Sequence, residues 1–153
     1  IYGSRNIEYI ESTEASIAEA LSVSDLVIGA VYVVGKEAPK VVTEAMLDRM
    51  TPGSVLVDIS IDQGGCFETS QPTNHDEPTY VKKGVVHYCV TNMPGAVPLT
   101  ATHALNKATL PFILDLANKG IDRALKEDEY LLNGLNIQDG VVMHPAVKEA
   151  LSS

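Results

Sequence analysis

The sequence is poor in cysteine and in basic residues. Its 153 residues include two cysteines, Cys66 and Cys89, which are not in a Cys-x-x-Cys spacing. A disulfide framework is therefore excluded, and the composition is typical of a reducing compartment such as the cytoplasm. Eleven Lys and Arg residues against 20 Asp and Glu residues leave a formal net charge of −9 at pH 7, which argues against nucleic acid or an anionic membrane as the partner.

Long apolar runs, a secretory signal and a phosphate-binding glycine loop are also missing. No run reaches the length of a membrane span, so no membrane partner is expected, and no signal peptide is present at the start. The first residue is Ile1 rather than Met, and we expect the chain to begin partway through a longer protein. Because there is no G-x-G-x-x-G, any dinucleotide would need a pyrophosphate loop and a ribose carboxylate from upstream of Ile1.

What is present fits a globular protein with one substantial core. Apolar residues make up 45% of the chain and charged residues 20%. The length suits a single domain but is short for a two-domain enzyme. Apolar strands alternate with helical patterns and predict an α/β fold with a parallel sheet, with strands expected at 25–31, 55–62 and 85–90. Parallel neighbours require right-handed crossovers, which bring the carboxyl ends of the strands to one edge.

The helices follow from capping residues and apolar spacing. Residues 13–22 form the first helix, and Thr43 caps a second one that buries Met46, Leu47 and Met50. After residue 98 the pattern becomes helical, and we place a boundary near Val97–Leu99 between a dinucleotide-type half-domain and a helical tail. The tail is expected to contain a long helix capped by Thr100 or Thr102 with a kink or break near Thr109, short helices at 121–126 and 145–151, and a hairpin at Asp139-Gly140.

Asp62 is the candidate functional residue of the central strand. It follows the apolar pattern of Val55 to Ile61 and precedes Gly64 and Gly65, which allow positive φ and a close approach to a ligand. We expect Asp62 at the carboxyl end of a strand that is buried on both faces, the edge where open α/β sheets bind ligands. The alternative is that Asp62 only caps the next turn and that the glycines only form a loop.

The residues after the three strands are suited to a nicotinamide ring. Val31, Ile59 and Met93 offer an apolar wall, and backbone groups together with Asn92 offer hydrogen bonds to a carboxamide. A carboxylate at Asp62 would favour developing positive charge or hold a proton-transferring partner. The alternative is that the three apolar side chains are ordinary core residues.

Metal binding is not expected. Cys66, His75, His87 and Cys89 match no zinc spacing. His87 and Cys89 alternate on one strand face, where both residue types are usually part of the core. His103 and His144 stand alone near helix starts and are interpreted as structural.

Four segments resemble NAD-dependent alanine dehydrogenases of the alanine dehydrogenase and pyridine nucleotide transhydrogenase family. They are VDISIDQGGCFE at 57–68, HYCVTNMPGAVP at 87–98, APK at 38–40 and ATLP at 108–111. The resemblance covers essentially all of the chain. It implies a Rossmann-like fold, with residues 1–98 as the C-terminal half of the NAD-binding domain and residues 99–153 as the C-terminal helical part of the substrate domain.

The resemblance also implies a reaction and its site. The family interconverts L-alanine with pyruvate and ammonia using NAD, usually as a homohexamer. Its active-site aspartate corresponds to Asp62. Its NAD contacts correspond to Ser12, Val31, Tyr32, Ile59, Ser60, Ile61, Asp62, Val90, Thr91, Asn92 and Met93. Its substrate-binding lysine and arginine and its acid/base histidine lie in an N-terminal domain, so this chain is expected to be inactive alone.

Two other functions are compatible with the same sequence. A transhydrogenase-like NAD(H)-binding subunit would exchange hydride between two nucleotides, and a non-catalytic module would only bind nucleotide.

The chain departs from the family at Gln71. The family usually has an Arg at this position, where it makes an NAD contact.

Overall fold

The structure, a computed structural model, describes residues 7–152. These residues form two compact units. The first contains the described residues up to Val33 together with Glu37–Met93. The second contains Val34–Lys36 and the described residues from Pro94 onward.

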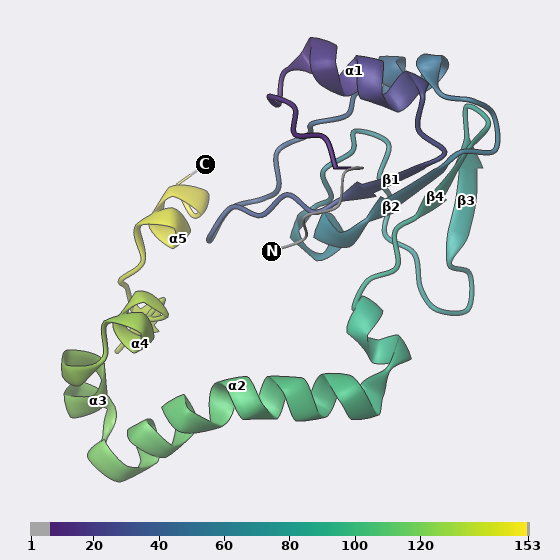
Figure 1. Ribbon diagram of the computed structural model, residues 1–153. Helices are drawn as coiled ribbons and strands as arrows, with labels where there is room; N and C mark the ends of the chain where they lie inside the picture. The colour runs from purple at the N-terminus through teal and green to yellow at the C-terminus, as the bar shows by residue number, and fades with distance from the viewer. Residues whose placement is uncertain (1–6, 153) are drawn as a thin grey trace. The chain divides into compact units, whose positions relative to one another are not determined.

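The first unit is built on a four-stranded sheet with the order β1-β2-β4-β3 (Figure 1). The parallel strands are β1 (Leu26–Gly29), β2 (Val55–Asp58) and β4 (Val85–Tyr88), which confirms the predicted α/β fold. At the edge, β3 (Thr79–Lys82) pairs antiparallel with β4. β3 was not predicted, because it has only four residues and directly follows a long segment rich in Gly, Pro, Ser, Thr and Asn.

Two helices and a loop cover one face of this sheet (Figure 1). The helix α1 (Glu14–Ser22) begins as predicted, with a capping box in which Thr13 and Ser16 bond each other's backbone N–H groups. The second helix, η1 (Glu44–Arg49), is a 3-10 helix. Thr43 is its N-cap residue, as predicted, but the Thr43 side chain makes no capping hydrogen bond, and the Glu68 carboxylate accepts the Glu44 N–H at 2.6 Å.

The core lies between these helices and β2. Leu47, Leu56, Phe67 and Val85 are at most 1% exposed. Gly29 allows the closest approach in this core, because a Cβ there would lie 2.3 Å from Cys66 Sγ and 2.6 Å from the Phe67 ring. The end of β1 can therefore lie directly on the Cys66–Phe67 segment.

The central strand is shorter than predicted and is not buried on both faces. Leu56 and Asp58 are buried, whereas Val55 and Val57 are only half-buried. The strand ends at Asp58, whose carboxylate accepts the Ser60 N–H at 3.0 Å and starts a 3-10 helix, η2 (Ile59–Gln63). Asp62 therefore lies on η2 and not at the carboxyl end of the strand.

The Asp58 carboxylate also holds the loop that follows η2. It accepts the Cys66 N–H at 2.8 Å, the Phe67 N–H at 3.4 Å and the Ser70 hydroxyl. Its side chain is fully buried. Each of its donors lies within twelve residues of Asp58, so the carboxylate fixes the fold of the chain from the end of β2 to Ser70.

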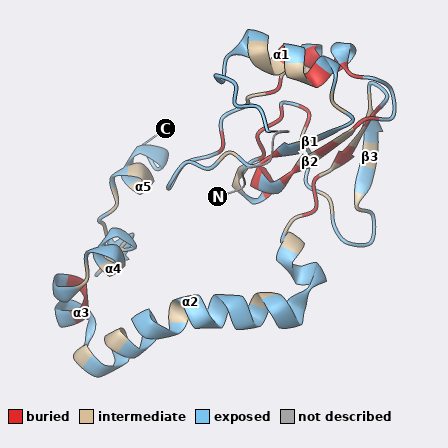
Figure 2. Ribbon diagram, viewed as in Figure 1, coloured by how far each residue is buried: buried red, intermediate tan, exposed pale blue. Residues whose placement is uncertain are grey.

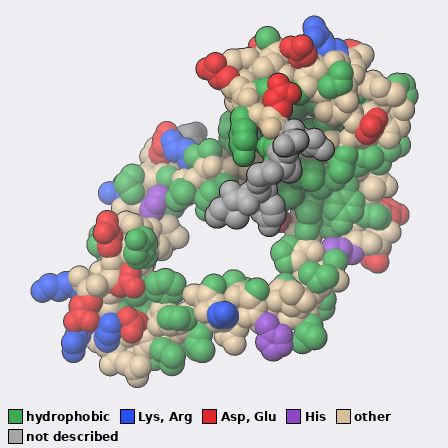
Figure 3. Space-filling view, viewed as in Figure 1, with side chains coloured by type: hydrophobic (Ala, Val, Ile, Leu, Met, Phe, Trp, Pro, Cys, Tyr) green, Lys and Arg blue, Asp and Glu red, His purple; other side chains and the backbone are tan. Residues whose placement is uncertain are grey.

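The second unit begins within η3 (Met93–Ala96) and continues into α2 (Pro98–Lys119). The capping prediction for Thr100 or Thr102 was wrong, because Pro98 occupies the first helical position, which suits its fixed φ and missing N–H. Of the kink or break expected near Thr109, the break does not occur, since α2 continues through Pro111. Within its unit α2 buries no residue, and exposed apolar side chains lie along it (Figures 2 and 3).

The remaining elements follow the predicted boundaries closely. Gly120 ends α2 at a φ of 77°, and Asp139 and Gly140 turn the small hairpin with φ values of 50° and 78°. The elements are α3 (Ile121–Glu127), α4 (Glu129–Asn133), β5 (Ile137–Gln138), β6 (Val141–Val142) and α5 (Pro145–Ala150). Within residues 7–152, no helix combines the length and the apolar character that a bilayer crossing needs.

We expect Asp58→Ala to lower the free energy of unfolding by about 3 kcal/mol or more, because it leaves buried N–H groups without an acceptor. Urea denaturation measures the change. The matched control is Asp48→Ala, which removes an exposed carboxylate paired with Lys83 and should cost less than about 1 kcal/mol. Equal denaturation midpoints for the two variants would contradict this role of Asp58.

Candidate functional site

Two hydrogen bonds join the segments that follow β1, β2 and β4. The Ser60 hydroxyl, on η2, donates to the carbonyl oxygen of Val31 at 2.8 Å. Both carboxylate oxygens of Asp62 accept the backbone N–H of Asn92, at 3.1 and 3.3 Å. The structure therefore brings together four of the predicted site residues, from three separate strands.

Asn92 has the conformation that this contact requires. Its φ is +51°, in the left-handed region that Asn tolerates better than most residues. Its carbonyl oxygen lies 3.3 Å from Nε2 of His75, on the long loop before β3. Asp62 is itself exposed, and the remaining lone pairs of its carboxylate are free to accept from a ligand.

None of the three predicted wall residues is fully buried, although Val31 packs against the hydrophobic core. Ile59 is 51% exposed, and Val31 and Met93 are half-buried. An apolar cavity of about 200 Å³ between α1 and β1 extends to Val31. Each of the three side chains thus keeps apolar surface that a flat ring could cover.

The other predicted site residues differ in what they can offer. Ile61 and Val90 are buried, at 3% and 0% exposed, so they support the site from within and offer almost no surface to a ligand. Tyr32 is exposed, and Thr91 is half-buried with its hydroxyl 3.4 Å from the Thr73 carbonyl oxygen. Ser12 is exposed next to the cap of α1, and within the described part of the chain no hydrogen bond joins it to the rest of the site.

Sequence reasoning missed two residues that support this arrangement. One is Asp58, and its only signal was a carboxylate in an otherwise apolar run. The other is Lys40, whose ammonium donates to the carbonyl oxygens of Gly64 and Gly65 at 2.5 and 2.7 Å. Both glycines have positive φ, as predicted, at 89° and 75°.

His87 is held by protein groups on both ring nitrogens. Nδ1 lies 3.0 Å from the carbonyl oxygen of Val85, and Nε2 lies 2.7 Å from the Thr69 hydroxyl. The Tyr80 ring stacks on it at a centroid distance of 4.8 Å. Burial lowers the pKa of His87 below its usual value, so the neutral ring is favoured.

The thiols of both cysteines are also in contact with other protein groups. Burial, and next the charge of Asp58, raises the pKa of the Cys66 thiol to about 11, so it stays protonated at neutral pH. Cys89 Sγ lies 3.6 Å from the Tyr80 hydroxyl. Across residues 7–152, no cluster of three or more His, Cys, Asp and Glu side chains could hold a metal ion.

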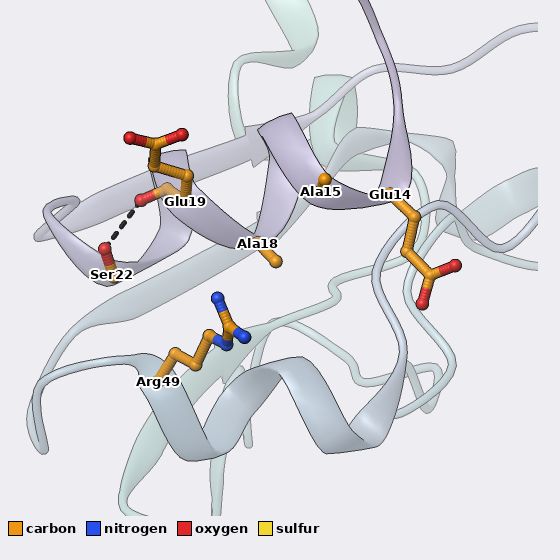
Figure 4. A pocket seen from close by; sticks show the side chains of 6 residues that line it. All are labelled: Glu14, Ala15, Ala18, Glu19, Ser22 and Arg49. Carbon is orange, nitrogen blue, oxygen red and sulfur yellow. Dashed lines mark hydrogen bonds between the residues drawn. The ribbon is translucent and has the colours of Figure 1, made fainter.

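A separate groove of about 520 Å³ lies between α1 and η1. Figure 4 shows the Arg49 guanidinium reaching from η1 toward α1, where Glu14 and Glu19 lie on the helix and Ala18 forms the floor. Its lining includes none of the predicted site residues. The strand-end cluster therefore remains the candidate site.

The model of one protein family, described as alanine dehydrogenase/PNT, C-terminal domain, matches residues 1–145. The chain belongs to this family. Its sequence is 60% identical over 139 residues to the alanine dehydrogenase of Halomonas elongata, an alignment that covers 91% of this chain and 38% of that protein. The chain thus spans about two fifths of the length of the curated relatives that it matches.

Solved structures agree with this assignment. An L-alanine dehydrogenase superposes with a TM-score of 0.82 at 50% identity, covering 99% of this chain and 41% of that one. A transhydrogenase from Sinorhizobium meliloti superposes with a TM-score of 0.63 at 28% identity, covering 88% of this chain and 36% of that one. The chain is therefore an α/β, Rossmann-like member of the family, and it is more similar to the first protein than to the second.

The buried neutral state of His87 predicts a loss of stability in acid. Its folded pKa lies below the unfolded value of about 6.5, so below that pH the unfolded chain binds more protons. The contribution is fully present above pH ~6.5 and is lost as pH falls, by at most about 1.4 kcal/mol per pH unit. Urea unfolding at pH 7.5 and 5.5 should show a smaller loss for His87→Gln than for the parent protein.

His103→Gln serves as the control for this experiment, because His103 is exposed on α2. It should retain the pH dependence of the parent protein. An unchanged pH dependence in His87→Gln would show that another group is responsible.

Proposed function

We propose that the chain is the C-terminal part of an NAD-dependent alanine dehydrogenase, an oxidoreductase that interconverts L-alanine with pyruvate and ammonia. The observation that carries the proposal is the juxtaposition of the Asp62 carboxylate with the ends of β1 and β4 through Ser60 and Asn92. The identity of 50–60% to proteins named alanine dehydrogenase supports the same reaction.

The described residues fit the nicotinamide end of NAD. Val31, Ile59 and Met93 leave apolar surface exposed beside the polar cluster, which suits one face of a flat ring. The exposed Asp62 carboxylate and the Asn92 side chain offer an acceptor and donors for a carboxamide. NAD, when bound, supplies the acceptor for the hydride that leaves the substrate.

Asp62 has the clearest catalytic role in this proposal. Its carboxylate is fixed by the Asn92 N–H but remains exposed, so it can stabilise positive charge that develops on the substrate nitrogen. Ser60 acts indirectly, because the hydrogen bond from its hydroxyl to Val31 holds η2 against the end of β1. Ile61 and Val90 are buried and would support the site from within, whereas Thr91 is half-buried and could contact the ligand.

The remaining parts of the proposal follow from the family. Residues 1–98 would complete an NAD-binding domain with an upstream half, and residues 99–153 would belong to the substrate domain. Ser12 and Tyr32 would contact NAD at its periphery. We further propose a cytoplasmic homohexamer for the full-length protein.

A transhydrogenase-like role is the second candidate, favoured by the structural similarity to the S. meliloti protein. The lower identity of that match makes it the weaker one. A non-catalytic nucleotide-binding module is the third possibility. The upstream sequence separates them, because a glycine loop together with a substrate-binding Lys and His would favour the dehydrogenase.

The proposed role of Asp62 predicts the kinetics of a substitution. In the full-length protein, Asp62→Asn should lower kcat for alanine oxidation by about 10²–10³-fold, the size expected when one fixed electrostatic group is lost. Alanine-dependent NADH formation, followed by absorbance, measures it. Asp76→Asn, an exposed carboxylate of the loop before β3, is the matched control and should leave kcat unchanged. Normal turnover by Asp62→Asn would remove Asp62 from the mechanism.

The 153-residue chain alone should not form NADH from alanine. It contains no G-x-G-x-x-G loop for the pyrophosphate. The same absorbance assay, with the full-length protein as positive control, checks this. Turnover by the isolated chain would overturn the assignment of the substrate-binding residues to an upstream domain.

A further inference from the structure

We propose that Lys40 is a positioning residue for the site: its ammonium holds the Gly64–Gly65 turn and thereby the orientation of η2 and of the Asp62 carboxylate. This inference rests on the proposed function, because it gives Lys40 a role in the reaction at Asp62. Lys40 itself contacts neither Asp62 nor Asn92 through any hydrogen bond within the described part of the chain.

The contact is part of a continuous set. Four successive carbonyl oxygens, from Gln63 to Cys66, all accept hydrogen bonds from the segment 38–41. The Ala38 N–H bonds Gln63 at 2.8 Å, and the Val41 N–H bonds Cys66 at 2.8 Å. Lys40 Nζ donates to the two carbonyl oxygens between them, those of Gly64 and Gly65, at 2.5 and 2.7 Å. Lys40 thus supplies the only side-chain donor in this set.

A cation is suited to this position for two reasons. The carbonyl oxygens after η2 lie at the negative end of a helix, where a positive charge is stabilising. Two successive left-handed residues also leave their carbonyl oxygens without helical partners, and an ammonium has three donors with which to bond both. A neutral side chain of the same length would leave both oxygens without a protein donor.

The same glycines complete η2 from the other side. The Gly64 N–H donates to Ile61 at 3.1 Å, and the Gly65 N–H donates to Ser60 at 3.0 Å. These two acceptors are the residues directly before Asp62, and Ser60 is also the residue that bonds Val31. A shift of the glycine turn therefore changes the orientation of the helix turn that carries Asp62.

Gly65 is closely packed against Asp58 and Ser70, so the turn has little space in which to move. A Cβ at this position would lie 2.8 Å from Asp58 Oδ2 and 2.8 Å from Ser70 Cβ. The turn is thus closed on one side by the buried carboxylate and on the other by Lys40. Removing the ammonium releases only the exposed side, so we expect the fold to persist while the position of Asp62 becomes less well defined.

The expected effect is on kcat more than on NAD binding. Displacing a reacting group by about 1 Å can lower a rate by up to about 10²-fold. Lys40→Met in the full-length protein should therefore lower kcat for alanine oxidation by about 10- to 100-fold, with KM for NAD changed by less than about threefold. Lys40→Arg retains a cation with several donors and should recover kcat to within about threefold of the parent.

The matched control is Lys82→Met. Lys82 lies on β3 of the same unit and pairs with Glu44 at 2.9 Å, away from the glycine turn. Like Lys40→Met, the Lys82→Met substitution removes one cation, and it also removes a surface ion pair. It should leave kcat within about twofold of the parent. Equal kcat values for Lys40→Met and Lys82→Met would overturn the inference.

A double variant tests whether Lys40 acts through Asp62. In an Asp62→Asn background, Lys40→Met should cause no further loss of kcat, because the group that it positions is gone. A full additional loss would show that Lys40 acts by another route. A parent protein that forms no NADH from alanine would instead contradict the proposed function itself.

Hydrogen exchange supplies a readout that does not depend on activity. The amides of Gly64 and Gly65 should exchange faster in Lys40→Met than in the parent and in Lys82→Met, whereas amides of the Leu56 region of β2 should exchange at an unchanged rate. Unchanged exchange at both glycines would overturn the inference. Faster exchange throughout β2 would do so as well, since it would indicate general loss of stability.

Discussion

Asp58 is the last residue of β2, and its carboxylate is fully buried. It is bonded by backbone N–H groups of Ser60, Cys66 and Phe67 and by the Ser70 hydroxyl, and within residues 7–152 no Lys or Arg pairs with it. A buried carboxylate is tolerated only where such donors replace water. The strand end, the helix turn and the loop after it therefore have to adopt their conformations together.

This constraint places the candidate site without contributing an atom to it. Because Asp58 starts η2, the next turn of chain carries Ser60 toward the end of β1 and Asp62 toward the end of β4. The carboxylate that would act on a ligand is thus exposed, while the one that determines its position is buried. Such a division separates the requirements of stability from those of chemistry.

Much of this arrangement could be predicted from local patterns, and the failures share a cause. The parallel strands and the helices after Thr13 and Gly120 follow from apolar spacing and capping residues, which are local. The early end of β2 was missed because Ile59 and Ile61 continue the apolar pattern, while the donors that end the strand come up to twelve residues later. Lys40 was missed because its acceptors lie 24 and 25 residues away.

Gly29 links the end of β1 to the Cys66–Phe67 segment through direct contact, since even a methyl group there would overlap both side chains. Position 29 therefore does not accept a side chain while Cys66 and Phe67 keep their present positions. An alanine there becomes tolerable only after a smaller residue has replaced Cys66 and the Phe67 ring has moved, and each of those changes alone opens a void in the core. Substitutions at positions 29, 66 and 67 are therefore epistatic. Changes at 66 and 67 have to come before a side chain at 29 if every intermediate is to fold.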